Sequence, residues 1–92
     1  MTDPVVEQIR EQITSADRSL VETLNKRLKL VQQLRRYKER HGLAFLDPAR
    51  EEWMLRYLTR ANRGPLSAEG LEELYAHILE LTKRETAQGA EA

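Results

Sequence analysis

The feature that most constrains the fold is a long stretch without helix-breaking residues. No glycine or proline lies between Pro4 and Gly42, and apolar residues recur there with a mean spacing of about 3.6 residues, the period of an α-helix. They are Val5, Ile9, Ile13, Ala16, Leu20, Leu24, Leu28, Val31 and Leu34. Asp3 and Pro4 form an N-cap followed by proline at the first helical position. Gly42 marks the C-terminal end of the same helix. The pattern predicts one continuous helix from about Pro4 to Arg40.

Two shorter helices are predicted after the first. Asp47 and Pro48 repeat the signal of a cap followed by proline, and the helix that they begin ends near residues 62–65, Asn-Arg-Gly-Pro. The third helix begins after Ser67, a good N-cap residue, and its apolar spacing continues to about Thr86. All of the regular structure in the chain is therefore predicted to be helical.

The chain is short enough to form one domain with one protruding helix. We find no strand alternation or repeat, so residues 1–92 are predicted to form a single all-α domain, with residues 88–92 as a frayed tail. A first helix of about 36 residues is roughly 54 Å long, whereas a compact chain of this length has a radius of gyration of about 12 Å. Two shorter helices cannot cover its whole apolar stripe, so we expect a second copy of the chain to do so, in an intertwined homodimer.

Composition argues against several classes of protein. The 15 Lys and Arg residues balance 15 Asp and Glu residues, which argues against nucleic acid as a partner. There is no cysteine, and the two histidines, His41 and His77, are far apart, so no metal site is predicted. No apolar run approaches the ~18 residues of a membrane span, and the N-terminal residues lack the pattern of a secretory signal. We therefore expect a cytoplasmic protein that has no membrane partner.

Two basic residues of the first helix lie on its apolar stripe. With Arg27 at 0° on a helical wheel of about 100° per residue, Lys38 falls at about 20° and Leu34 at about −20°. Cations on a buried stripe are costly unless an anion pairs with them. Their separation of roughly 16 Å along the helix axis lets both reach a small dianion. Two alternatives stay open: long basic side chains extend to solvent from a core edge, or an internal carboxylate such as Glu51 or Glu80 pairs with them.

Other charged residues each have two interpretations. Arg10 lies about 100° from the stripe and about 25 Å from Arg27 along the axis, so it is either a surface arginine or reaches a partner's pocket in an antiparallel dimer. Asp47 and Glu51 cluster with Arg50 at the start of the second helix. They are either helix-capping residues or acceptors for a substrate hydroxyl group. The residue pattern alone does not choose between these interpretations.

Several short motifs occur along the chain at a characteristic spacing. They are Ile-Arg-Glu-Gln-Ile at 9–13, Ala-Asp at 16–17, Leu-Asn-Lys-Arg at 24–27, Tyr-Lys at 37–38 and Asp-Pro-Ala-Arg-Glu at 47–51. Each motif is weak alone, but with this spacing the chain resembles the all-helical class of chorismate mutases over roughly residues 5–87. The last motif and the loop at 62–65 look especially like mutase domains fused to 3-deoxy-7-phosphoheptulonate synthase. A fused or associated synthase is therefore a candidate partner.

The resemblance implies an activity and an assembly. The activity is that of an isomerase of aromatic amino acid biosynthesis, in the shikimate pathway, which converts chorismate to prephenate without a cofactor. The assembly is a homodimer with two sites shared between its chains. Arg27 resembles the arginine that binds one substrate carboxylate, and Lys38 the cation that contacts the ether oxygen and a carboxylate. Arg10 resembles the arginine that binds the second carboxylate in the partner's site.

The resemblance also gives roles to residues of the second and third helices. Glu51 resembles the acceptor for the ring hydroxyl of the substrate, and Asp47 and Arg50 resemble supporting residues at the same rim. Thr82 lies where the family commonly has Ser, and Thr86 where it usually has a Gln or Glu that bonds to the ether oxygen. Because a threonine side chain is shorter, this last position departs from the family pattern.

The residue types suit such a reaction. An intramolecular [3,3] rearrangement needs no nucleophile, oxidant or proton transfer. Catalysis then depends on holding a flexible dianion in its reactive conformation, which arginines do through charge-assisted hydrogen bonds to carboxylates. It also depends on stabilising the negative charge that grows on the ether oxygen, for which a preorganised lysine is suitable.

Three other functions stay open at this point. Isochorismate pyruvate lyases resemble chorismate mutases of this class in fold and pocket, so a lyase is the first alternative. The second is a regulatory domain of a fused aromatic-pathway enzyme, which would bind chorismate or prephenate as a signal. The third is a nucleic-acid-binding module, because residues 26–40 carry seven basic residues and one acidic residue. The position of Arg27 and Lys38 on the apolar stripe argues against this third function.

Overall fold

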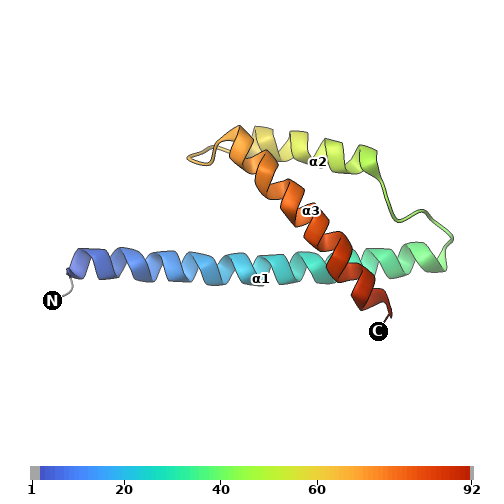
Figure 1. Cartoon of the computed structure of the whole chain (residues 1–92), viewed down its shortest axis with the longest axis horizontal. Helices are drawn as coiled ribbons and strands as arrows, with labels where there is room; N and C mark the ends of the chain where they lie inside the picture. The colour runs from blue at the N-terminus through green and yellow to red at the C-terminus, as the bar shows by residue number, and fades with distance from the viewer. Residues whose placement is uncertain (1–2, 92) are drawn as a thin grey trace.

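The chain folds into three α-helices. The computed structural model describes the backbone of residues 3–91 and the side chains of residues 3–87. The helices are α1 (Pro4–Arg40), α2 (Pro48–Ala61) and α3 (Ala68–Glu91) (Figure 1). The predicted all-α, three-helix fold is confirmed. Residues 88–91 of the predicted tail continue α3 as a helix, and Ala92 lies outside the described residues. In the part of the chain described, no helix is both long and apolar enough to cross a bilayer.

The helix boundaries follow the capping residues that the sequence contains. The Asp3 carboxylate accepts hydrogen bonds from two backbone N–H groups of the first turn of α1, at 2.8 and 3.3 Å. Asp47 accepts one from the first turn of α2 at 3.1 Å, and the Ser67 hydroxyl accepts one from the first turn of α3 at 2.9 Å. After α1, Gly42 adopts a φ of 65°, a left-handed conformation that glycine tolerates well. Local sequence therefore sets all three helix starts.

The third helix holds the other two together. It packs against both α1 and α2, whereas the backbones of α1 and α2 make no contact with each other. In Figure 1, α3 crosses the C-terminal half of α1, and the N-terminal half of α1 extends away from the other helices. The radius of gyration is 17.2 Å, well above the ~12 Å of a compact chain of this length. As predicted, the first helix projects from the rest of the protomer.

Much of the apolar stripe of α1 has no cover within one chain. No residue of α1, the whole of which is described, is buried. Ile9, Ile13 and Leu20 on the projecting half are 51%, 55% and 61% exposed. Among the described residues, Leu71 is the only buried hydrophobic residue. A contiguous apolar surface of this kind is typical of an interface with another protein chain.

The loop between α1 and α2 folds back onto α1. The guanidinium group of Arg35 lies 4.7 Å from the centre of the Phe45 ring, and the Lys38 ammonium lies 3.5 Å from the Phe45 carbonyl oxygen. These contacts place Asp47, the cap of α2, near the last turns of α1. The loop thereby closes one side of the space between the two helices.

Candidate active site

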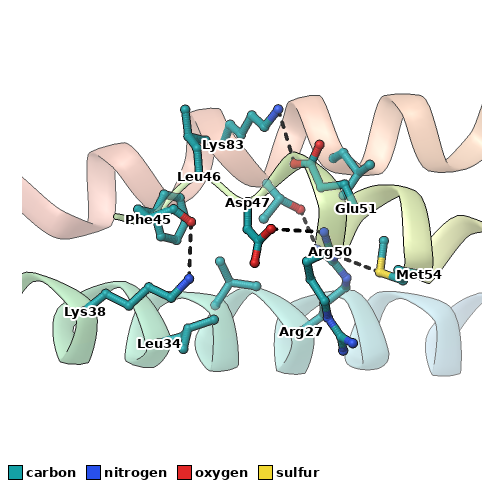
Figure 2. A pocket seen from close by; sticks show the side chains of 13 residues that line it. Arg27, Leu34, Lys38, Phe45, Leu46, Asp47, Arg50, Glu51, Met54 and Lys83 are labelled. Carbon is teal, nitrogen blue, oxygen red and sulfur yellow. Dashed lines mark hydrogen bonds and ion pairs between the residues drawn. The ribbon is translucent and has the colours of Figure 1, made fainter. Parts of the chain in front are cut away.

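A pocket of about 240 Å³ lies between the three helices. Figure 2 shows side chains entering it from α1, from α3, and from the loop and first turns of α2. The lining residues are the cations Arg27, Lys38, Arg50 and Lys83, the carboxylates Asp47 and Glu51, and the uncharged Val31, Leu34, Phe45, Leu46, Met54, Leu79 and Thr82. Four cations against two carboxylates give an excess of two positive charges. The pocket thus suits a small dianion that has apolar surface.

Arg27 is held in place by the other two helices. Its Nη1 donates a hydrogen bond to Thr82 Oγ1 on α3 at 2.7 Å, and its Nη2 lies 4.0 Å from Met54 Sδ on α2. Thr82 Oγ1 itself donates to the Ile78 carbonyl oxygen at 2.6 Å. No carboxylate of the described residues forms an ion pair with Arg27. Its positive charge is therefore oriented by neutral groups and stays available to a ligand.

Lys38 lies at the opposite end of the pocket floor. In Figure 2 its ammonium group points from α1 toward the carbonyl oxygen of Phe45. The distance of 3.5 Å is long for a hydrogen bond, and none of the described carboxylates pairs with Lys38. The same helix face therefore carries two cations into the pocket, about 16 Å apart along its axis. Arg27 and Lys38, both predicted site residues, thus line the same pocket.

The three charged residues at the start of α2 also reach the pocket lining. One oxygen of Asp47 is used as the helix cap. The guanidinium of Arg50 lies 4.3 Å from the centre of the Trp53 ring. Glu51 is the internal carboxylate that pairs with a cation, but its partner is Lys83, at 3.3 Å, and not Arg27 or Lys38. Capping and pocket lining are thus compatible for Asp47.

Two predicted site residues do not lie in this pocket. Thr86 is fully buried and donates its hydroxyl hydrogen bond to the Thr82 carbonyl oxygen at 2.7 Å. Its hydroxyl hydrogen is therefore used within its own helix, and Thr86 is not among the residues that line the pocket of this chain. Arg10 lies on the projecting half of α1, where its side chain is 68% exposed and pairs with Glu7 at 3.2 Å. Arg10 cannot reach the pocket of its own chain.

Lys83 is a pocket residue that the sequence argument missed. On α3, Leu79, Thr82 and Lys83 follow the spacing i, i+3, i+4, which places them on neighbouring parts of one helix face. All three line the pocket. On a wheel of about 100° per residue, however, Lys83 lies about 120° from Leu71 and about 140° from Ile78, off the apolar stripe of the third helix, so the pattern that singles out Arg27 and Lys38 gives no signal for Lys83.

Thr82 and Thr86 provide a matched pair of substitutions. Both hydroxyls donate to the carbonyl oxygen four residues earlier, but only that of Thr82 accepts a hydrogen bond from Arg27. We expect Thr82→Val to lower kcat/KM about tenfold or more, because a hydrogen bond to a charged group is worth about 1.5–3 kcal/mol. Thr86→Val should change kcat/KM less than about threefold, since it removes only a neutral bond within its own helix. Steady-state kinetics of both variants, with helix content checked by circular dichroism, measure the difference; equal losses would contradict this role of Thr82.

Fold and pocket together define a class of protein. The chain is an all-helical domain whose pocket offers an excess of positive charge to a small anionic molecule. No group of three or more His, Asp or Glu side chains that could hold a metal ion occurs in the described residues. The polar side chains that line the pocket are those of arginine, lysine, aspartate, glutamate and threonine.

The particular family follows from comparison with known proteins. The family model for chorismate mutase type II matches residues 9–87. The chain belongs to this family, as the motifs in its sequence suggested. Two solved structures of chorismate mutase from Thermus thermophilus have the same fold. The first is 32% identical with a TM-score of 0.84, covering 89% of this chain and 93% of that one. The second is 34% identical with a TM-score of 0.81, covering 84% and 96%.

Longer relatives contain a similar segment. A bifunctional chorismate mutase/prephenate dehydratase of Pseudomonas aeruginosa is 32% identical over an alignment of 76 residues, and the match covers 77% of this chain and 21% of the relative. The T-protein of Haemophilus influenzae is 36% identical over an alignment of 75 residues, and the match covers 80% of this chain and 20% of the relative. The chain thus spans about a fifth of the length of these relatives.

Proposed function

We propose that this chain is a chorismate mutase that isomerises chorismate to prephenate. In this rearrangement the ether C–O bond breaks and a C–C bond forms within one molecule, and no atom is gained or lost. The observation that carries the proposal is the pair Arg27 and Lys38. These cations enter one pocket from one face of α1, and neither is neutralised by a carboxylate among the described residues. A doubly anionic substrate supplies the missing charge.

The geometry supports a division of roles among the pocket residues. Arg27, oriented by Thr82, binds one carboxylate and limits the flexible side chain of the substrate to its reactive conformation. Lys38 stabilises the negative charge that develops on the ether oxygen as the C–O bond stretches. Glu51 accepts a hydrogen bond from the ring hydroxyl. Asp47 and Arg50 complete the rim beside it.

We propose further that the active form of this single domain, residues 1–92, is an intertwined homodimer. The exposed apolar residues along α1 support it, because a second α1 supplies a cover of matching length. In an antiparallel arrangement the projecting half of α1 brings Arg10 to the pocket of the partner subunit. Arg10 then binds the second carboxylate, a role that one chain alone cannot provide.

We also propose a partner enzyme and a cellular location for this chain. Relatives in which a mutase segment makes up a fifth of a longer chain support an association with other enzymes of the same pathway. The loop at residues 62–65 favours 3-deoxy-7-phosphoheptulonate synthase as that enzyme. A cytoplasmic location belongs to the same proposal and rests on the sequence pattern.

The activity is tested by incubating the purified chain with chorismate and identifying the product by mass-resolved chromatography. We expect chorismate to disappear and prephenate to form in equal amount. A parallel incubation with isochorismate distinguishes the mutase from an isochorismate pyruvate lyase, because a lyase would form salicylate and pyruvate. Binding of chorismate without conversion, measured by calorimetry, would instead identify a regulatory domain. Lyase products without any prephenate from chorismate, or binding without conversion, would contradict the proposed function.

A further inference from the structure

The pocket contains an ion pair to which the roles given above assign no function. Lys83 Nζ on α3 lies 3.3 Å from Glu51 Oε1 on the first turn of α2. Figure 2 shows the two side chains meeting at the edge of the pocket beside α3, on the side opposite Lys38. Among the described residues, Lys83 is the one pocket cation that pairs with a carboxylate.

The other pocket cations are held by different groups. Arg27 is bound to Thr82, and the guanidinium of Arg50 lies over the Trp53 ring. Lys83 differs because it contacts Glu51, the carboxylate that is proposed to accept a hydrogen bond from the ring hydroxyl of the substrate. The pair joins α3 to the start of α2, so it sets the direction of the Glu51 carboxylate relative to the pocket.

The pair leaves Glu51 able to accept a further hydrogen bond. Its Oε1 faces Lys83, and no hydrogen bond within the described residues holds Oε2. Asp47, the second carboxylate of the pocket, uses an oxygen to cap α2. Each of the two carboxylates therefore keeps one oxygen without a partner among the described residues; in Glu51 that oxygen is Oε2, and Lys83 is the group that restrains its orientation.

We propose that Lys83 is a positioning residue that acts through Glu51, a proposal that rests on the mutase function and on the hydroxyl contact given to Glu51. Lys83 holds the Glu51 carboxylate in the orientation in which its Oε2 accepts a hydrogen bond from the ring hydroxyl. The side chains of Lys83 and Glu51 are 50% and 35% exposed, so water screens the pair and its contribution to folding is small. Its effect is expected in substrate binding.

The kinetic signature of this role differs from that of Lys38. The hydroxyl does not react, so its hydrogen bond to Glu51 is equally strong in the bound substrate and in the transition state. Loss of an interaction of this kind raises KM and leaves kcat nearly unchanged. We expect Lys83→Met to raise KM for chorismate about fivefold, and Lys83→Arg to retain most of the wild-type affinity because it keeps the charge.

A double-mutant cycle with Glu51→Gln distinguishes positioning from direct substrate contact. If Lys83 acts through Glu51, Lys83→Met adds less than about a twofold change in KM to Glu51→Gln. If Lys83 binds a substrate carboxylate itself, its full effect persists in that background and the proposal is wrong. Arg84→Met is the matched control, because Arg84 is the next residue on α3, is 65% exposed and does not line the pocket.

The experiment separates failure of this inference from failure of the proposed function. The wild-type chain is assayed first, and absence of prephenate would reject the mutase function itself. With an active wild type, a KM for Lys83→Met equal to that for Arg84→Met would reject the positioning role alone. A large drop in kcat for Lys83→Met would also reject it, because that result assigns Lys83 to the transition state. Circular dichroism and sedimentation of each variant establish that fold and assembly are unchanged.

Discussion

Replacing Lys38 by alanine is expected to lower kcat about 10²- to 10³-fold, while the three helices remain intact. The ammonium group is the pocket cation aimed from the C-terminal part of α1 and is unpaired with any described carboxylate. Its proposed interaction, with charge that grows on the ether oxygen, exists mainly in the transition state. Removal of a preorganised donor of this kind typically costs about 3–4 kcal/mol of transition-state stabilisation. The loss should therefore appear in kcat rather than in KM.

A matched control is available on the same helix. Lys26 is also a lysine of α1, but it is exposed and does not line the pocket. Lys26→Ala removes the same charge from the chain and should change kcat less than about twofold. Stopped or continuous assays of chorismate loss at saturating substrate measure both variants. A Lys38→Ala enzyme with near wild-type kcat would show that Lys38, despite its position on the apolar stripe, does not contribute to catalysis.

The parts of this fold that could be predicted from sequence are those set by local chemistry. The three helix starts follow from Asp3, Asp47 and Ser67, whose side chains cap the first turns. The uninterrupted apolar spacing of the first helix predicted both its length and its exposed stripe. Arg27 and Lys38 stood out because a charge on an apolar stripe conflicts with burial, and such conflicts often mark functional sites.

The parts that could not be predicted depend on contacts between distant segments. Apolar spacing gives no information on which side of α1 the loop at residues 43–46 returns to, so the contact between Lys38 and Phe45 was not foreseen. Likewise, Glu51 had several cations as possible partners, and only the crossing of α3 over α1 and α2 selects Lys83. For Thr86, the resemblance to the family implied a substrate contact. Its hydroxyl instead bonds to a carbonyl oxygen of the preceding turn, as threonine in helices often does.

Mixing two inactive variants is expected to restore activity if the sites are shared between chains. Arg10→Ala and Arg27→Ala each remove one carboxylate-binding arginine, and each alone should lose about a hundredfold in kcat/KM. In a heterodimer of the two, one site has Arg27 from one chain and Arg10 from the other, and is intact. The second site lacks both arginines. Random exchange of subunits at equal concentrations should therefore restore about a quarter of the wild-type sites.

The geometry supplies a control mixture in which no recovery is expected. Arg27 and Lys38 line the same pocket of one chain, so a heterodimer of Arg27→Ala and Lys38→Ala has one defect in each of its two sites. This mixture should stay as inactive as its components, whereas Arg10→Ala with Arg27→Ala recovers. Native mass spectrometry of chains carrying tags of different mass establishes that subunits have exchanged in both mixtures. If Arg10 is only a surface arginine paired with Glu7, Arg10→Ala alone would keep nearly full activity, and the shared site would be rejected. Equal behaviour of the two mixtures after verified exchange would reject it as well, because only a site built from two chains distinguishes Arg10 from Lys38.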